Sequence, residues 1–397
     1  MNVWHENKRG GIFVDIERIL DEGINRGASD IHLIKGNLPM LRINKELIPV
    51  ENADALSQFD IEYAFRYFTE EDERLIENYK RERKLDINFE YNGNRLRVNI
   101  SSSLDSYVFT IRIIKKSLPE FDELKLPSIL KRIATLPQGL ILVTGKSNSG
   151  KSTTLNALVN EINKTENKKI LILESPIEYM HTSKKSLVVQ KEVGVGKDCL
   201  KFSDGVTNAL REDCDILVVG EIRDKDTMEA TIEMAESGHL VIGTMHTRSC
   251  AETIDRILSF YDVSDQLAIK YILSSILKAV VAQRLIKGMS DELVMIPEIM
   301  IVDEVIGSLI RKEKFSTTEI EDAMQSRMDR GNLSLMNSLA NAVIKGKITL
   351  IQAEKQIDET KHQLLTRTIR QLENRWKNSS INIYCFYKRH MPTHLQL

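Results

Sequence analysis

The sequence predicts a two-domain α/β protein, in which a small α+β domain precedes a larger domain built on a parallel sheet. The first observation is a set of short runs that alternate apolar and polar residues within residues 1–114. The second is an alternation of short apolar runs with helical stretches over residues 127–360. Short apolar runs of this kind are typical of strands buried on both faces of a parallel sheet. The third is the polar segment 115–126, which shows neither pattern and is predicted to be a linker.

The elements of the first domain follow from the spacing of its apolar residues. Helical spacing predicts one helix from Ile12 to Arg26 and a second from Asp60 to Lys80. Asn92-Gly93 is a hairpin signal, because both residues tolerate the positive φ angles of a tight turn. Alternation predicts five strands: Asp30 to Ile34, Met40 to Ile43, Leu85 to Tyr91, Arg95 to Ile100 and Tyr107 to Ile113.

The second domain is predicted to alternate strands and helices before it becomes helical. Thr153 to Ile162 reads as the helix after the first strand. The chain from Val263 to about Thr360 reads as helical, with breaks in the pattern around Gly288, Gly331 and Gly346. Residues 361–397 are basic and weakly patterned, and we expect a poorly ordered tail at their end. Four short apolar runs are the predicted parallel strands: Leu140 to Thr144, Lys169 to Leu173, Ile216 to Val219 and Leu240 to Thr244.

A glycine-rich segment between the first strand and first helix of this domain fits the pattern G-x-x-x-x-G-K-[ST]. Backbone N–H groups of such a loop, with the positive end of the helix dipole, bind phosphates. Lys151 adds a charge at the β- and γ-phosphates, and the Ser152 hydroxyl can bind Mg²⁺. The sequence therefore predicts a nucleoside triphosphate on Gly145, Lys146, Ser147, Asn148, Ser149, Gly150, Lys151, Ser152 and Thr153.

Polar clusters follow three further strands, and ligands sit at the carboxyl ends of parallel strands. Glu221 comes directly after an apolar strand, the position of a carboxylate that orients the attacking water. Gly220 stands where a Mg²⁺-organising Asp is usual, so Glu174 is the best candidate to assist Ser152 with the metal. A solvated helix-capping acid at Glu221, and a hydrogen-bonded core histidine at His246, remain alternatives.

Composition narrows the classes of protein. The net charge of −2 gives no global basic field of the kind that coats nucleic acid. No apolar run approaches the ~20 residues of a membrane-spanning helix, and the N-terminus lacks the apolar core of a signal peptide. We therefore expect a cytoplasmic protein. Cys199, Cys214, Cys250 and Cys385 form no C-x-x-C pair, which favours reduced structural thiols.

The polar clusters that contain Glu174, Glu221 and His246 resemble the Asp box, the atypical Walker B box and the His box of the type II/type IV secretion and pilus ATPases. Within that superfamily the resemblance is greatest to the PilT-like retraction ATPases of type IV pili. Further segments in the family's order extend the resemblance over nearly the whole chain: Arg26 to His32, Leu96 to Asn99, Ala209 to Asp213, Thr253 to Ile257, Ala282 to Leu285 and Ile320 to Gln325. The family has a PAS-like first domain and a RecA-like P-loop ATPase domain with a helical C-terminal region. This fold is what the resemblance implies here.

The resemblance also implies partners and further site residues. A homo-hexamer would hold ATP and Mg²⁺ between subunits, with Arg97, Arg112, Arg211 and Arg223 approaching the phosphates and Glu178 and His246 completing the boxes. Arginine suits this task because its planar fork pairs phosphate oxygens bidentately. A surface salt bridge is the alternative for each arginine. The implied partner is the inner-membrane platform protein of a pilus, with only peripheral membrane association.

Three departures from the family pattern bear on the function. Ser175 stands where the Asp box usually has Asp, and Lys146 to Asn148 replace the common Pro-Thr-Gly. Val305-Ile306-Gly307 replaces an Ala-Ile-Arg signature that is tied to retraction, which bears on retraction more than on ATP hydrolysis. Nothing familial is recognised after Thr360.

Features of the sequence distinguish the rival functions. A pilus assembly or type II secretion ATPase usually carries a tetracysteine insertion and a larger N-terminal region, neither of which is present. A RecA-like nucleic-acid translocase is disfavoured because no basic stripe with interleaved aromatics appears, so no nucleic-acid partner is expected. A nucleotide-gated scaffold without turnover stays open because of Ser175 and Gly220. The sequence thus favours an ATP-hydrolysing motor that drives pilus retraction and twitching motility.

Overall fold

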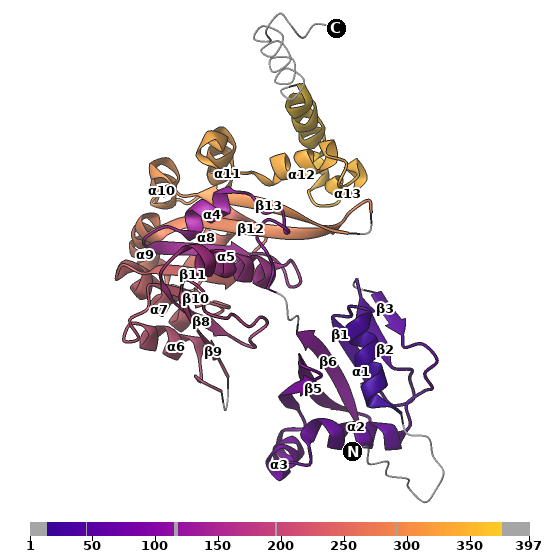
Figure 1. Ribbon diagram of the computed structural model, residues 1–397. Coiled ribbons are helices and arrows are strands. Elements are labelled where there is room, and N and C mark those ends of the chain that lie inside the picture. Colours follow the sequence, from indigo (N-terminus) through magenta and orange to yellow (C-terminus); the bar gives the residue numbers. More distant parts are fainter. Residues whose placement is uncertain (1–13, 45, 115–117, 195–196, 291, 375–397) are drawn as a thin grey trace, which may run out of the picture. The chain divides into compact units, whose positions relative to one another are not determined.

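The computed structural model describes residues 14–44, 46–114, 118–194, 197–290 and 292–374 (Figure 1). The chain forms two compact units, which divide between Ser117 and Leu118. The predicted order, an α+β unit and then an α/β unit, is confirmed. Residues 118–126, expected within the linker, belong to the second unit, since Phe121 and Leu126 are buried in its core.

The first unit is a six-stranded antiparallel sheet in the order β3-β2-β1-β6-β5-β4. All five predicted strands are present, and Asn92 and Gly93 form the predicted turn with positive φ angles of 48° and 67°. The structure adds an edge strand, β3, which was not predicted. The strands are β1 (Asp30–Ile34), β2 (Met40–Ile43), β3 (Glu46–Pro49), β4 (Leu85–Tyr91), β5 (Asn94–Ser103) and β6 (Ser106–Ile114).

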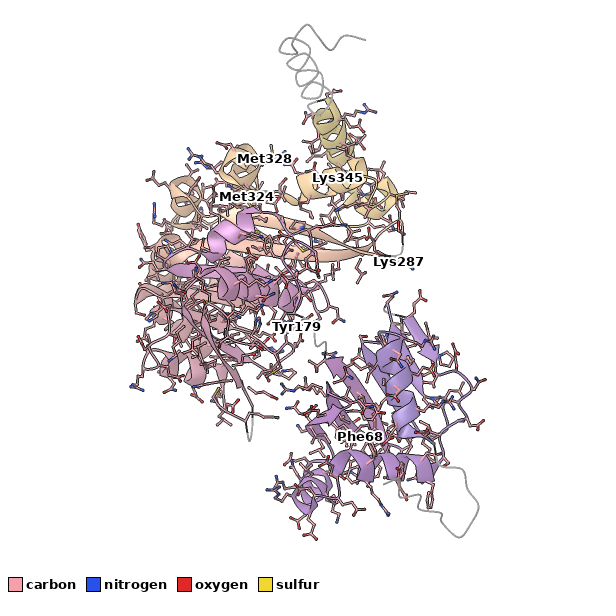
Figure 2. All side chains as sticks on the ribbon, in the orientation of Figure 1. Phe68, Tyr179, Lys287, Met324, Met328 and Lys345 are labelled. Carbon is pink, nitrogen blue, oxygen red and sulfur yellow. The ribbon has the colours of Figure 1, made fainter. Side chains whose placement is uncertain are left out.

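Three helices accompany this sheet: α1 (Ile16–Asn25), α2 (Gln58–Thr69) and α3 (Glu73–Glu82). The single helix predicted from Asp60 to Lys80 is wrong, because Glu70 and Glu71 adopt left-handed φ angles of 50° and 58° that end α2. Asp72 then caps α3 by accepting the backbone N–H of Arg74. Phe68 of α2, labelled in Figure 2, is buried with its ring centroid 5.8 Å from that of Phe109 in β6.

The second unit contains a seven-stranded sheet in the order β13-β12-β7-β11-β10-β8-β9. All neighbours are parallel except β12 and β13, which form an antiparallel hairpin. This hairpin contradicts the helical prediction for residues 277–301, and the predicted break around Gly288 lies between its two strands. The strands are β7 (Gly139–Thr144), β8 (Lys169–Glu174), β9 (Leu187–Glu192), β10 (Ile216–Val219), β11 (Leu240–Met245), β12 (Leu277–Lys287) and β13 (Leu293–Ile301).

The helices of the second unit lie on both faces of the sheet and beyond its hairpin edge (Figure 1). They are α4 (Ile129–Ala134), α5 (Lys151–Thr165), α6 (Phe202–Ala209), α7 (Lys225–Glu236), α8 (Cys250–Leu258), α9 (Val263–Ile276), α10 (Glu304–Ile310), α11 (Thr317–Ser326), α12 (Leu335–Ile344), α13 (Leu350–Glu354) and the 3₁₀ turns Met328–Arg330 and Glu359–Lys361. Residues 362–374 of the predicted tail are helical, and its remainder lies outside the described residues. Every helix of the described chain is too short or too polar to span a bilayer.

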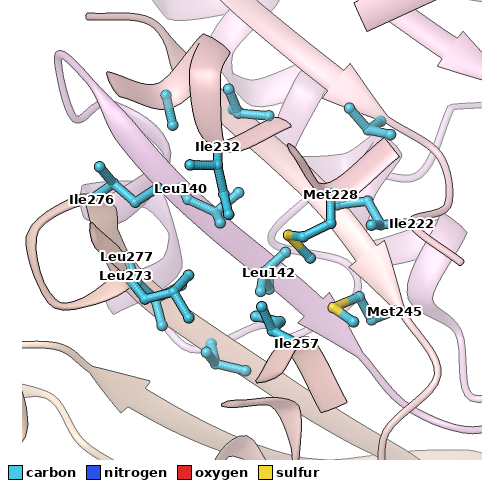
Figure 3. Close-up of a cluster of buried hydrophobic side chains, with 14 of the residues drawn as sticks. Leu140, Leu142, Ile222, Met228, Ile232, Met245, Ile257, Leu273, Ile276 and Leu277 are labelled. Carbon is cyan, nitrogen blue, oxygen red and sulfur yellow. The ribbon is translucent and has the colours of Figure 1, made fainter. Parts of the chain in front are cut away.

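The buried central strand β7 shows why the sheet needs helices on both faces. Leu140 and Leu142 pack toward α7 and α8, as Figure 3 shows, while Ile141 and Val143 pack toward α4 and α5. Successive side chains of a strand point to opposite faces, so a run without polar residues must be covered twice. The carboxyl ends of the parallel strands consequently meet at one open edge, where the predicted polar clusters lie.

Candidate nucleotide site

Strand register brings the predicted clusters together in the second unit. Leu173 pairs with Val219 across β8 and β10, and Val219 pairs with Gly243 across β10 and β11. The residues that follow these strands, including Glu174, Glu221 and His246, therefore share the edge with the glycine-rich loop that follows β7. Sequence order alone separates these residues widely, and parallel pairing makes them neighbours.

The glycine-rich loop has the backbone that phosphate binding requires. Asn148 and Gly150 adopt positive φ angles of 60° and 85°, and α5 begins directly afterwards at Lys151. At Gly145, φ is 152° and an added Cβ would lie 2.5 Å from the carbonyl oxygen of Gln283. Only glycine fits there, so the loop packs closely against β12 while its N–H groups and the helix N-terminus serve an anion.

Gln283 of β12 is a site residue that sequence reasoning did not assign a role. It is buried, and its Nε2 donates a hydrogen bond to the carbonyl oxygen of Ser149 at 2.8 Å. The loop is thus fixed from a strand more than a hundred residues away. The signal was present in Ala282 to Leu285, but β12 was not recognised as a strand, so its side chains could not be placed.

Lys151 lies over the loop with its side chain buried. Its Nζ donates to the carbonyl oxygens of Gly145 at 2.9 Å and Lys146 at 3.1 Å. Burial lowers the pKa of this ammonium group, and the carboxylates of Glu221 and Glu178 oppose that shift. Both acids therefore act electrostatically on the lysine, while the role of Glu178 in the site stays a prediction.

Glu221 is connected to Lys151 through His246. The carboxylate Oε1 of Glu221 lies 2.7 Å from His246 Nε2, and His246 Nδ1 lies 3.4 Å from Lys151 Nζ. Arg223 forms an ion pair with the same carboxylate. Helix α7 is capped by Asp224, and the His246 side chain is 41% exposed. The capping-acid and core-histidine alternatives are therefore both wrong.

Gly220 and Glu174 share the space between β8 and β10. A Cβ at Gly220 would lie 2.8 Å from the carbonyl oxygen of Leu173 and 3.2 Å from Glu174 Cα. An Asp at this position would clash with backbone, so the strand geometry itself excludes the usual acid. Glu174 is buried there, and Asn156 donates both to its Oε1 at 3.4 Å and to the Ser152 carbonyl at 2.9 Å.

These residues fit a magnesium–nucleotide complex. The amide of Asn156 donates both to the buried carboxylate of Glu174 and to the backbone carbonyl oxygen of Ser152. Because Gly220 has no Cβ, it leaves room for the Glu174 side chain. Within the described ranges no cluster of three or more His, Cys, Asp or Glu forms a metal cage. Mg²⁺ in nucleotide sites uses one or two protein oxygens together with phosphates and waters, so Ser152 and Glu174 suffice as candidates.

The four predicted arginines differ in their surroundings. Arg223 lies in the site, whereas Arg211 is exposed just after α6 and has no described side-chain partner. Arg97 and Arg112 are paired across β5 and β6 in the first unit. Their Nε atoms lie 3.4 Å from Asp86 and 3.1 Å from Asp30 respectively, both partly exposed pairs. The phosphate roles of Arg97, Arg112 and Arg211 stay predictions.

A cavity of about 440 Å³ adjoins the start of α5. Gly150, Thr153 and Thr154 form its wall next to the phosphate loop, and residues 123–127, the β12–β13 hairpin and α12 form the rest. Lys345, labelled in Figure 2, lines it at the end of α12. This cavity has the size of a small-molecule site and adjoins the phosphate loop.

Residues 5–379 match the family described as type II/IV secretion system protein. The chain belongs to this family. The match continues beyond Thr360, where no family segment was recognised from the sequence, as far as residue 379. The predicted PilT-like membership is confirmed by relatives that align with most of the chain.

Three relatives in the type II/IV secretion system family are informative. The chain is 36% identical over 344 residues to the type IV pilus retractation ATPase PilT of Pseudomonas aeruginosa, covering 86% of this chain and 98% of that protein. It is 36% identical to a twitching motility protein of Neisseria gonorrhoeae, covering 78% and 82%. The crystal structure of the pilus retraction motor PilT with bound ADP superimposes with a TM-score of 0.78 at 32% identity, covering 88% and 99%.

Proposed function

We propose that this protein is an ATPase that hydrolyses ATP to ADP and phosphate. The observation that carries the proposal is the continuous chain of contacts from the loop lysine Lys151 through His246 to the strand-end carboxylate Glu221. A phosphate-binding loop coupled to a partly buried base is the arrangement that nucleotide hydrolysis needs. The relative solved with ADP supports the choice of nucleotide.

The chemistry follows from the position of each group. Glu221 accepts a proton from a water whose oxygen attacks the γ-phosphorus, and the bond from that phosphorus to the bridging oxygen breaks to release ADP. Lys151 releases its hydrogen bonds to the loop carbonyl oxygens and donates to phosphate oxygens instead. His246, in contact with both Lys151 and Glu221, connects the phosphate-binding lysine to the base. Ser152 and Glu174 would hold Mg²⁺ together with the nucleotide, and the ion would supply positive charge that offsets the charge of the phosphates.

The test is a matched pair of substitutions assayed by phosphate release. Glu221→Gln should bind ATP normally and lose about 10²–10⁴-fold in turnover, because a positioned base is removed. Glu236→Gln, on the exposed end of α7, is the matched control and should leave turnover unchanged. Normal turnover in Glu221→Gln would refute the assignment, and a wild-type protein that binds ATP without releasing phosphate would identify a scaffold.

In the cell, this ATPase is a motor for type IV pilus retraction and twitching motility. The support is its 36% identity across 98% of the retraction ATPase of Pseudomonas aeruginosa. A deletion strain should keep surface pili and lose movement on surfaces, and a Glu221→Gln copy should not restore it. A deletion strain without pili would instead identify an assembly ATPase, in which case Gly307 marks the relevant departure. Stimulation of turnover by single-stranded DNA would favour a translocase.

The working form is a homo-hexamer in the cytoplasm, bound peripherally at the inner face of the membrane to a pilus platform protein. Arg97 and Arg112 support an assembled site, since both lie on one strand pair, and their side chains are 34% and 47% exposed. Specific activity should rise with protein concentration as rings assemble, and Arg112→Ala should reduce it by up to about 10³-fold. Full activity in a monomer would contradict this form.

A further inference from the structure

Glu174 is part of a closed ring of hydrogen-bonded polar side chains, in which Glu174, Asn156 and His181 are buried and Gln190 is half-buried. Asn156 of α5 donates to one carboxylate oxygen of Glu174, and Gln190 of β9 donates to the other, each at 3.4 Å. His181 contacts both amides: its Nε2 lies 2.6 Å from Asn156 Oδ1, and its backbone N–H donates to Gln190 Oε1 at 2.8 Å. Four residues from α5, β8, β9 and the intervening loop thus form one network.

The direction of each hydrogen bond follows from what the partners can donate. Two N–H groups of His181 occupy the carbonyl oxygens of Asn156 and Gln190, so both NH₂ groups must face the carboxylate of Glu174. Those NH₂ groups have second acceptors in the carbonyl oxygens of Ser152 and Tyr179, at 2.9 Å and 2.8 Å. One residue therefore sets the orientation of both amides.

The tautomer that this arrangement requires agrees with the surroundings of the ring. Nδ1 of His181 is buried and has no hydrogen-bond partner, as expected when the proton is on Nε2. Burial, assisted by the charge of Lys184, lowers the pKa of His181 to about 4, so the imidazole is neutral near pH 7. A neutral ring with one N–H donates in one direction only, toward Asn156.

We propose that His181 is a positioning residue for the metal carboxylate: through Asn156 and Gln190 it holds Glu174 beside Ser152 in the orientation that Mg²⁺–nucleotide binding uses. This inference rests on the proposed function, which assigns Glu174 to the metal. Outer-shell hydrogen bonds orient the ligands of metal sites, and their loss typically costs 10–100-fold in metal affinity. His181 itself touches neither substrate nor metal.

The test compares two amide substitutions that differ in where the donor lies. The amide nitrogen of His181→Gln reaches the position of Nε2 and should keep the bond to Asn156. That of His181→Asn falls near Nδ1 and should lose it. The readout is Mn²⁺ binding, followed by electron paramagnetic resonance with a non-hydrolysable ATP analogue, beside fluorescent nucleotide binding in EDTA. His181→Asn should bind Mn²⁺ 10–100-fold more weakly with unchanged metal-free nucleotide affinity, and His181→Gln should match the wild type.

Glu174→Gln separates this inference from the proposed function. If Glu174→Gln leaves Mn²⁺ affinity unchanged, the metal role of Glu174 fails. If it weakens Mn²⁺ binding and His181→Asn does not, only the role of His181 fails. The double variant should bind Mn²⁺ no more weakly than Glu174→Gln alone, because both changes remove one interaction. Additive losses, or equal losses in His181→Asn and His181→Gln, would show that His181 is merely structural.

Discussion

Gly220→Ala tests whether the crowded strand edge explains the unusual glycine before Glu221. The added methyl would lie 2.8 Å from the carbonyl oxygen of Leu173, the atom that accepts the Gly220 N–H at 2.7 Å. The Gly220 carbonyl oxygen in turn accepts the Thr244 hydroxyl, so the glycine backbone is held on both sides. The methyl can fit only if β8 and β10 separate, and forced overpacking of this kind costs about 1–3 kcal/mol.

The expected result is a fall in the melting temperature on the order of 2–12 °C, from the usual 2–4 °C per kcal/mol for units of this size. Gly307→Ala is the matched control, because its Cβ would make only ordinary contact, 3.4 Å from the Ser274 carbonyl oxygen. Within helix α10 it should stabilise by up to about 1 kcal/mol. A Gly220→Ala protein as stable as the wild type would refute the packing argument.

Gly220→Asp should be less stable than Gly220→Ala and should not tighten Mg²⁺ binding. Thermal melts measure the stability of these variants, and Mn²⁺ titrations measure their metal affinity.

Three further predictions concern other parts of the site and its support. Gln283→Met removes the donor to the Ser149 carbonyl and should weaken ADP binding by roughly tenfold in a fluorescence titration. Unchanged affinity would mean that the phosphate loop keeps its conformation without this hydrogen bond. Burial raises the pKa of Glu298 to about 7 from an ordinary 4.5, so the folded state keeps a proton that the unfolded state loses between these values. Stability should therefore fall by about 1.4 kcal/mol per pH unit as pH rises through this window, and urea midpoints of Glu298→Gln should lack that slope. Ser175→Asp adds a carboxylate beside Glu174 and should raise Mg²⁺ affinity or turnover; a decrease in both would mean that this site is tuned differently from its relatives.

The sequence predicted best where a local pattern has one structural meaning. The phosphate loop needs particular residues at fixed spacing, and its strand and helix follow within a few positions, so Gly145 to Thr153 could be assigned without any tertiary information. Asn92-Gly93 is similar, since its turn is closed by the backbone of adjacent residues. Parallel strands such as β10 were bounded correctly because burial on both faces leaves an unbroken apolar run.

Errors arose where two structures satisfy the same local pattern. The apolar stretches of β12 and β13 are compatible with buried helices, and only pairing with β7 decides that they are strands. The helix predicted from Asp60 to Lys80 keeps its apolar spacing across the break, which depends on two residues in left-handed conformations. Neither outcome is encoded in the period of the apolar residues.

The chain by itself determined that a nucleotide is bound and which acids follow which strands. Tertiary structure decided how those groups cooperate: His246 links Lys151 to Glu221 because β11 lies between β7 and β10. It also decided that position 220 has no room for a side chain, because the neighbouring backbone of β8 fills that space. The physical reason is that sequence motifs record local backbone geometry, whereas contacts between strands depend on packing among residues far apart in the chain.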